Sequence, residues 1–224
     1  MKDLVVIGAG GYAQELMWVA DDMNSREMRW NILGYLDPGQ PERRGQTLYD
    51  RPILGGYDYF RSDGEIWFCC GIGSPAARQK ECEEAERRGL KPATLIHPTA
   101  IIARHASIGE GCVVGAGVIL TPYSSLGRHC ALNIGVGVGH DSSVGDYAVL
   151  SPYAQVLGNA IIGRLAFLGA NSTVQLGRRM GASSVLGANS FLLTDLEAGA
   201  SAIGIPAKVF VRQSGQLRAA RLSR

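Results

Sequence analysis

A histidine followed directly by a carboxylate is the strongest candidate for chemistry in this sequence. His140 and Asp141 stand in the segment Val138-Gly139-His140-Asp141-Ser142. An imidazole is partly neutral near pH 7 and takes up a proton readily, and an adjacent carboxylate holds one tautomer and stabilises the imidazolium. The pair therefore predicts a general base, with a solvated surface histidine as the alternative interpretation.

A second candidate site is the glycine-rich segment Gly8-Ala9-Gly10-Gly11-Tyr12-Ala13. It follows the apolar residues 4–7 and precedes a helix-like pattern over residues 14–22. Glycines at such a strand-to-helix turn let a phosphate approach the free N–H groups of the helix N-terminus. Asp37 ends the next apolar run, where an acidic group commonly meets a sugar hydroxyl. The segment predicts a nucleotide site, and a tight turn without a ligand is the alternative.

The elements that must position these residues divide the chain near residue 94. From Ile96 to Leu192, every sixth residue is aliphatic or methionine, which gives 17 positions without a slip, and 30 of the 224 residues are glycine. A six-residue period matches neither an α-helix nor a coiled coil. We therefore predict a triangular solenoid, a parallel β-helix in which each hexad supplies one strand and one turn and three hexads make a coil of 18 residues.

Residues 1–94 show a different pattern, with expected strands at 4–7, 32–36 and 66–70 and a second helix from Ser74-Pro75 to about Arg88. This alternation predicts a half-Rossmann α/β unit with a parallel sheet. The predicted domains are residues 1–94, the β-helix at 95–211 and a basic tail at 212–224. The tail is either a solvated end or a contact for an anionic ligand.

The other histidines and the cysteines argue against a metal site. The intervals between the four histidines at 97, 105, 129 and 140 are 8, 24 and 11 residues, which fit no zinc pattern. His105 and His129 each lie three residues after an inward aliphatic position, so both are expected to face solvent. The five cysteines form no C-x-x-C pair and fit a reducing compartment.

The charge balance and the hydropathy pattern exclude several classes of protein. Twenty-two basic and 20 acidic residues give a net charge of +2, which argues against a nucleic-acid binder. No apolar run reaches the length of about 18 residues that a membrane span needs, and the N-terminus lacks the layout of a signal peptide. We therefore expect a cytoplasmic protein.

The hexads resemble the left-handed β-helix of hexapeptide-repeat acyltransferases. Together with the glycine-rich N-terminal unit they resemble sugar acetyltransferases of the bacillosamine N-acetyltransferase and sialic acid O-acetyltransferase type. Further matching segments are Tyr35-Leu36-Asp37, Gly71-Ile72-Gly73, Leu132-Asn133 and Gly204-Ile205-Pro206-Ala207-Lys208. The chain departs from the pattern of this family at Tyr12, where many members have histidine, and at Pro38, where many have an acid.

The resemblance implies a homotrimer that uses acetyl-CoA, with His140 as catalytic base and Asp141 as its partner. It implies sugar-nucleotide contacts at Gly10, Gly11, Tyr12, Asp37, Gly73 and Asn133. It implies acetyl-CoA contacts at Val149, Gly158, Ala170 and Ala188.

We therefore expect direct transfer of an acetyl group from acetyl-CoA to the amino group of a nucleotide-linked amino sugar, without a metal. Two alternatives stay open at this point. One is O-acetylation of a sugar hydroxyl, and the other, in a different class, is a non-catalytic trimeric scaffold that binds a nucleotide.

Overall fold

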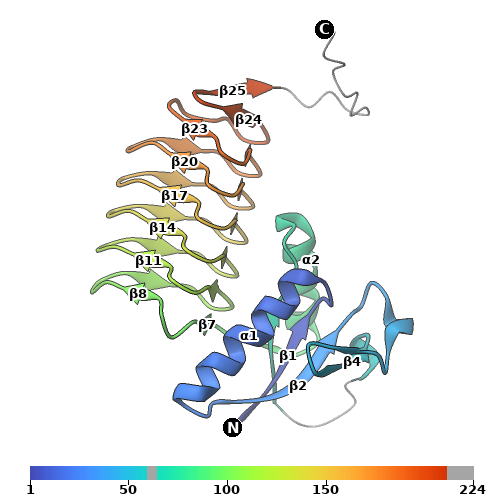
Figure 1. Ribbon diagram of the computed structural model, residues 1–224. Coiled ribbons are helices and arrows are strands. Elements are labelled where there is room, and N and C mark those ends of the chain that lie inside the picture. The colour runs from blue at the N-terminus through green and yellow to red at the C-terminus, as the bar shows by residue number, and fades with distance from the viewer. Residues whose placement is uncertain (60–64, 211–224) are drawn as a thin grey trace, which may run out of the picture.

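In the computed structural model, which describes residues 1–59 and 65–210, an α/β domain packs against the first coils of a β-helix (Figure 1). The α/β domain contains one sheet with the strand order β3-β4-β2-β1-β5-β6, in which all neighbours are parallel except β3 and β4. Its elements are β1 (Lys2–Ile7), α1 (Gly11–Arg26), β2 (Trp30–Leu36), η1 (Pro41–Arg43), β3 (Thr47–Leu48), β4 (Arg51–Gly55), η2 (Tyr57–Tyr59), β5 (Ile66–Cys70), α2 (Pro75–Arg87) and β6 (Lys91–Pro92). The predicted half-Rossmann unit is confirmed.

The two helices cover opposite faces of this sheet. Side chains along β1 alternate between two clusters: Leu4 and Val6 pack with the apolar face of α1, whereas Val5 and Ile7 pack with Cys82 and Ala85 of α2. Such alternation is inherent to a strand whose two faces are both buried. The helix predicted over residues 14–22 extends in the structure from Gly11 to Arg26, and its first turn includes the buried Ala13.

The β-helix consists of two-residue strands stacked into three faces. The parallel β-helix predicted from the hexads, and the left hand implied by the resemblance to hexapeptide-repeat acyltransferases, are confirmed. The first face contains β7 (Leu95–Ile96), β10 (Val113–Val114), β13 (Ala131–Leu132), β16 (Val149–Leu150), β19 (Phe167–Leu168), β22 (Val185–Leu186), β24 (Ser201–Gly204) and the antiparallel β25 (Ala207–Phe210). The second face contains β8 (Ile101–Ile102), β11 (Ile119–Leu120), β14 (Gly137–Val138), β17 (Gln155–Val156), β20 (Thr173–Val174) and β23 (Phe191–Leu192). The third face contains β9 (Ser107–Ile108), β12 (Ser125–Leu126), β15 (Ser143–Val144), β18 (Ile161–Ile162) and β21 (Arg179–Met180).

Each of the 17 hexad positions is the second residue of such a strand. From Ile96 to Val174 it pairs with the residue 18 positions later in the next coil, whereas Met180 and Leu186 pair with Leu196 and Ala202, which lie 16 positions later. From Val114 to Leu192 these side chains are at most 5% exposed, so they form the interior of the prism. The small residues Cys112 and Cys130 lie at equivalent corners and are completely buried.

The α/β domain covers the first face of the prism and one of its corners. Leu95 and Val113 belong to the cluster that contains α1, and Tyr147 belongs to the cluster that contains α2. The expectation that His129 faces solvent is wrong, because α2 covers its corner and leaves the residue 0% exposed. His105 lies at a different corner, between the second and third faces, where its ring stacks on Tyr123 at 5.3 Å, and it is exposed as expected. The basic tail at 212–224 lies outside the described residues.

His129 is held on three sides. Its ring stacks between Phe68 and Tyr147, with centroids at 5.8 and 5.3 Å, and its Nε2 lies 2.8 Å from Glu86 Oε1. Burial, the largest influence, lowers the pKa of His129, and the hydrogen bond to Glu86 opposes it. The folded state therefore favours the neutral imidazole.

A matched pair of glycine substitutions tests how closely the helix and the sheet pack. A Cβ at Gly71 would lie 2.6 Å from the Cα of Ala13, whereas a Cβ at Gly73 would meet nothing within 4 Å. We expect Gly71→Ala to lower the free energy of unfolding by about 1–3 kcal/mol and Gly73→Ala to change it by less than about 0.5 kcal/mol. Chemical denaturation of both variants measures the difference, and equal stabilities would contradict the packing described.

The burial of His129 predicts a loss of stability in mild acid. The pKa is lower in the folded state than the ordinary value of about 6.5 in the unfolded chain, so the unfolded state binds more protons as pH falls through that value. The free energy of unfolding should therefore decrease from pH 7.5 to pH 5.5. Replacement by His129→Gln, which retains a donor toward Glu86, should flatten this dependence. Denaturation curves that fall equally in both proteins would show that another group is responsible.

Candidate active site

The strand order of the α/β domain creates a crevice at its carboxyl edge. After β1 the chain leads to β2 on one side, whereas β5 lies on the other side of β1. The loops after β1 and β5 therefore run in opposite directions along the sheet. Ligands of open α/β sheets bind in the crevice between two such loops. The first loop contains Gly10 and Gly11 at the start of α1, and the second contains Gly73 before α2.

The three glycines leave open space at this crevice. A Cβ at Gly10, Gly11 or Gly73 would have no heavy atom of another part of the chain within 4 Å. Packing within the chain therefore does not explain why these residues are glycines. No side chain caps α1 at Gly10 and no acidic residue lies in its first turn. The free N–H groups and the positive end of the helix dipole therefore favour an anion at this point.

Asp37 has an ion-pair partner that the sequence pattern did not reveal. Its Oδ2 lies 2.8 Å from Nη1 of Arg43, and the same Nη1 donates to the carbonyl oxygen of Ala9 at 3.2 Å. Arg43 lies six residues after Asp37, in the short helix η1. Only the fold of the intervening loop brings the two side chains into contact. It therefore adds a cation to the edge that bears Gly10. The direct contact of Asp37 with a sugar stays a prediction.

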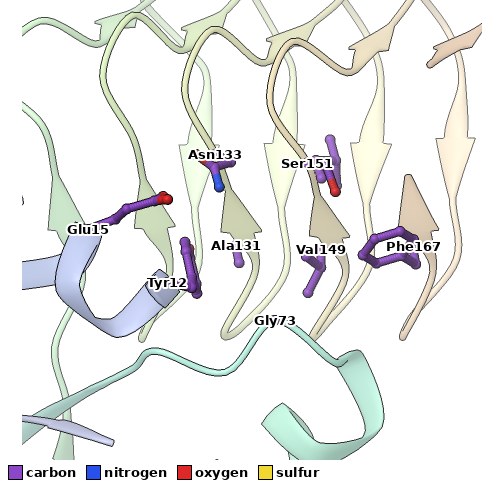
Figure 2. A pocket seen from close by; sticks show the side chains of 9 residues that line it. Tyr12, Glu15, Gly73, Ala131, Asn133, Val149, Ser151 and Phe167 are labelled. Atoms are coloured by element: carbon purple, nitrogen blue, oxygen red, sulfur yellow. The ribbon is translucent and has the colours of Figure 1, made fainter. Parts of the chain in front are cut away.

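A cavity of about 150 Å³ lies between this edge and the first face of the β-helix (Figure 2). It contains three of the predicted sugar-nucleotide residues, Tyr12, Gly73 and Asn133, together with Val149, which was predicted to contact acetyl-CoA. It also contains residues that the sequence analysis did not select: Glu15, Ala131, Leu150, Ser151 and Phe167. Glu15 follows Tyr12 by one helical turn, and Asn133 and Ser151 are 18 residues apart. In the known fold, a spacing of one helical turn and a spacing of one coil each place two residues on the same surface, which here lines the cavity.

The polar groups of the cavity comprise a carboxylate, an amide and a hydroxyl. Figure 2 shows Glu15 directed toward Asn133, with Ser151 on the neighbouring coil. Asn133 Oδ1 accepts from the N–H of Ile134 at 2.6 Å, so its amide nitrogen is free to donate toward a ligand. Among the residues that the structure describes, no lysine or arginine lines the cavity. Burial raises the pKa of the Tyr12 phenol, which is therefore neutral near pH 7.

His140 and Asp141 form the predicted pair. Nδ1 of His140 lies 2.8 Å from Oδ2 of Asp141, and the side chains are 56% and 52% exposed. Asp141 has a φ of 57°, a left-handed conformation that aspartate tolerates better than most residues. With Nδ1 engaged by the carboxylate, Nε2 is the atom available to accept a proton.

Gly158 occupies the place above the imidazole in the next coil. A Cβ there would lie 2.5 Å from Nε2 of His140. The N–H of Asn159 donates to the carbonyl oxygen of His140 at 2.8 Å, which fixes the two coils in register. Because Gly158 has no side chain, the imidazole of His140 can occupy the space beside it.

A single chain does not bring the cavity and the histidine together. The cavity lies on the first face, against β13 and β16, whereas His140 lies at the corner between the second and third faces, after β14. The four predicted acetyl-CoA residues are also divided. Val149 lies in the cavity, Gly158 beside His140, and Ala170 and Ala188 on the corner that follows the first face.

Within the described ranges 1–59 and 65–210, no three His, Cys, Asp or Glu side chains gather in a way that would hold a metal ion. Across the same residues, no helix is both long and apolar enough to span a membrane.

Comparisons with known proteins agree with this architecture. Residues 3–85 match the PglD N-terminal domain, and residues 106–122 and 159–194 match the hexapeptide repeat of succinyl-transferase. A curated relative, the UDP-N-acetylbacillosamine N-acetyltransferase of Bacillus subtilis (strain 168), is 30% identical over 119 residues. That match spans 52% of this chain and 52% of the relative, so it covers about half the length of each.

Two solved structures match nearly the whole chain. The acetyltransferase domain of PglB from Neisseria gonorrhoeae FA1090 is 26% identical with a TM-score of 0.85, covering 94% of this chain and 100% of that domain. A histidine-to-asparagine variant of perosamine N-acetyltransferase from Caulobacter crescentus, in complex with CoA and GDP-perosamine, is 28% identical with a TM-score of 0.84 and covers 94% and 98%. In both of its domains, the chain therefore resembles the PglD-type hexapeptide-repeat sugar N-acetyltransferases.

Proposed function

We propose that the protein transfers the acetyl group of acetyl-CoA to the amino group of a nucleotide-linked amino sugar. The observation that carries the proposal is the exposed His140–Asp141 pair, with Nδ1 bound to the carboxylate and Nε2 open beside Gly158. The similarity to solved enzymes supports it, because the similar perosamine enzyme was solved with CoA and GDP-perosamine. The expected cytoplasmic location supplies acetyl-CoA and keeps five buried thiols reduced.

The charges around the crevice indicate how the substrate lies. The diphosphate is negative, so it belongs at the N-terminus of α1, where Gly10 and Gly11 leave space and Arg43 adds a cation. The cavity next to it has the carboxylate of Glu15, the hydroxyl of Ser151 and no basic side chain. It therefore suits an uncharged or amino-bearing part of the substrate rather than a phosphate.

The chemistry is a direct transfer that needs one base. The amine nitrogen attacks the thioester carbonyl carbon and loses a proton to Nε2 of His140, while Asp141 stabilises the imidazolium. The tetrahedral intermediate then releases the CoA sulfur, which takes the proton from the imidazolium, and the amide remains on the sugar. The oxyanion needs an N–H donor, and that of Gly158 is the candidate. All five cysteines are buried, so no exposed thiol offers an acyl-enzyme route.

Because the cavity and His140 lie on different sides of one prism, the proposal requires a second copy of the chain. We propose a threefold homotrimer in which one subunit supplies the cavity and its neighbour supplies His140. Exposed apolar side chains of the second face, the third face and the corners beside the second face support such contacts. They include Ile101, Ile119, Tyr123, Tyr153, Leu157, Ile161 and Leu176. Several exposed apolar side chains on adjoining faces are a feature of surfaces that contact another protein.

The test of the function measures loss of the acetyl-CoA thioester with UDP-, dTDP- and GDP-linked amino sugars. We expect the wild-type protein to acetylate one of them at nitrogen, and His140→Ala to lower kcat by about 10²–10⁴-fold, the range of a general base. Gly158→Ala, which pushes a methyl group against Nε2, should also lower kcat. His105→Ala is the matched control, because His105 is exposed at the equivalent corner two coils earlier.

Thioester loss with the hydroxyl analogue of the sugar but not with the amine would replace N-acetylation by O-acetylation. Nucleotide binding without any thioester loss would support the non-catalytic scaffold instead. Full activity of a folded His140→Ala protein would remove the histidine from the mechanism.

Subunit complementation tests the shared site. His140→Ala removes the base, and Gly73→Trp fills the cavity, so each homotrimer should be inactive. Trimers co-expressed from the two genes at equal levels should recover about a quarter of the wild-type activity, because a site is intact when one neighbour supplies the base and the other an open cavity. Light scattering should give three times 23.9 kDa. No recovery in mixed trimers would place the whole site within one chain.

A further inference from the structure

Arg78 of α2 is a charged side chain that is buried completely at the junction between the two domains. Its Nε donates to the carbonyl oxygen of His129 at 2.6 Å, and its Nη1 donates to the carbonyl oxygen of Cys70 at 2.5 Å and to that of Ile72 at 3.4 Å. All three acceptors are backbone carbonyls. Two of them belong to the α/β domain and one belongs to the β-helix.

These carbonyls lie just before the two walls of the cavity. Cys70 and Ile72 lead into Gly73, which lines the cavity from the α/β domain. His129 leads into β13, whose Ala131 lines the cavity from the β-helix. One rigid, planar guanidinium thus fixes the backbone of both walls relative to each other.

The same helix also holds the His129 side chain. Glu86 lies two turns after Arg78 on α2 and accepts a hydrogen bond from His129 Nε2 at 2.8 Å, so α2 holds this residue by its carbonyl and by its ring. Arg128, which directly precedes His129 in the chain, forms an ion pair with the same Glu86 carboxylate at 2.7 Å. The attachment of α2 to the corner before β13 therefore rests on directed polar contacts as well as on apolar packing.

Stability alone is a poor explanation for Arg78. None of the ion pairs among residues 1–59 and 65–210 includes it, and its Nη2 is buried without a hydrogen-bond partner in that part of the chain. A buried cation without a carboxylate carries a desolvation cost that an apolar side chain of similar volume avoids. An apolar side chain does not hold three carbonyls at fixed positions.

We propose that Arg78 is a positioning residue that sets the separation of the two cavity walls and thereby the affinity for the sugar nucleotide, without touching the substrate. This inference rests on the proposed function of the cavity. It predicts that loss of Arg78 weakens binding of the sugar nucleotide and leaves acetyl-CoA binding and the proton transfer at His140 intact.

The experiment compares Arg78→Met, which retains the volume, and Arg78→Lys, which retains the charge, with Arg87→Met as the control. Arg87 is an exposed residue of the same helix whose only described ion pair is with Glu84. We expect Arg78→Met to raise KM for the sugar nucleotide at least tenfold while kcat and KM for acetyl-CoA change less than twofold. Arg78→Lys should give a smaller increase, and Arg87→Met should match the wild type.

Amide hydrogen exchange provides a second measurement that needs no turnover. In Arg78→Met, the amides of residues 71–74 and 129–131 should exchange at least tenfold faster, whereas those of the coils from β17 onward should stay unchanged. Equal KM values and equal exchange would overturn the proposal. Faster exchange throughout the chain, with both KM values unchanged, would reduce Arg78 to a stabilising residue and would also overturn it.

The two proposals fail in different ways. If the wild-type protein acetylates none of the amino sugars, the proposed function fails, and the exchange of residues 71–74 and 129–131 still decides whether Arg78 ties the walls together. If the wild type is active and Arg78→Met retains its KM for the sugar nucleotide, only the positioning role fails.

Discussion

The pairing of strand residues in adjacent coils, 18 positions apart over most of the β-helix, is the constraint on which the rest of the structure depends. Every short strand of the β-helix takes its backbone partners from the coils on either side, so each corner residue has fixed neighbours above and below. Gly158 lies over His140 for this reason, and a larger residue there would collide with the imidazole. The site thus depends on the residue types of adjacent coils as much as on the histidine itself.

The same stacking leaves the α/β domain with one surface to pack against. Two-residue strands make flat faces, and the first face is covered by α1 and by the loop before α2. Apolar contacts of Leu95 and Val113 hold the domain there, while Arg78 and Glu86 bind a defined point of one corner. Apolar packing tolerates small shifts, whereas hydrogen bonds with fixed directions do not. The cavity between the domains is therefore bounded by a junction with little freedom to slide.

Charge is distributed differently over the two adjoining regions to which the two ends of the sugar nucleotide are proposed to bind. The N-terminus of α1 and Arg43 offer positive potential at the sheet edge, whereas the adjacent cavity offers the carboxylate of Glu15 and neutral donors. His140 and Asp141 remain in contact with solvent on another side of the prism, as the proposed role of a base that acts on a neighbouring subunit's substrate requires.

The sequence by itself determined the repeat, the inward residue of every hexad and the adjacency of His140 and Asp141, and it predicted a division near residue 94, because each depends on local periodicity or on neighbours in the chain. It also indicated Tyr12, Gly73 and Asn133, through the turns and hexads in which they lie. It did not indicate Glu15, Arg43 or Arg78, since their roles depend on contacts between elements distant in sequence. The prediction for His129 failed for the same physical reason: its hexad position points outward, and only the packing of α2 against that corner buries it.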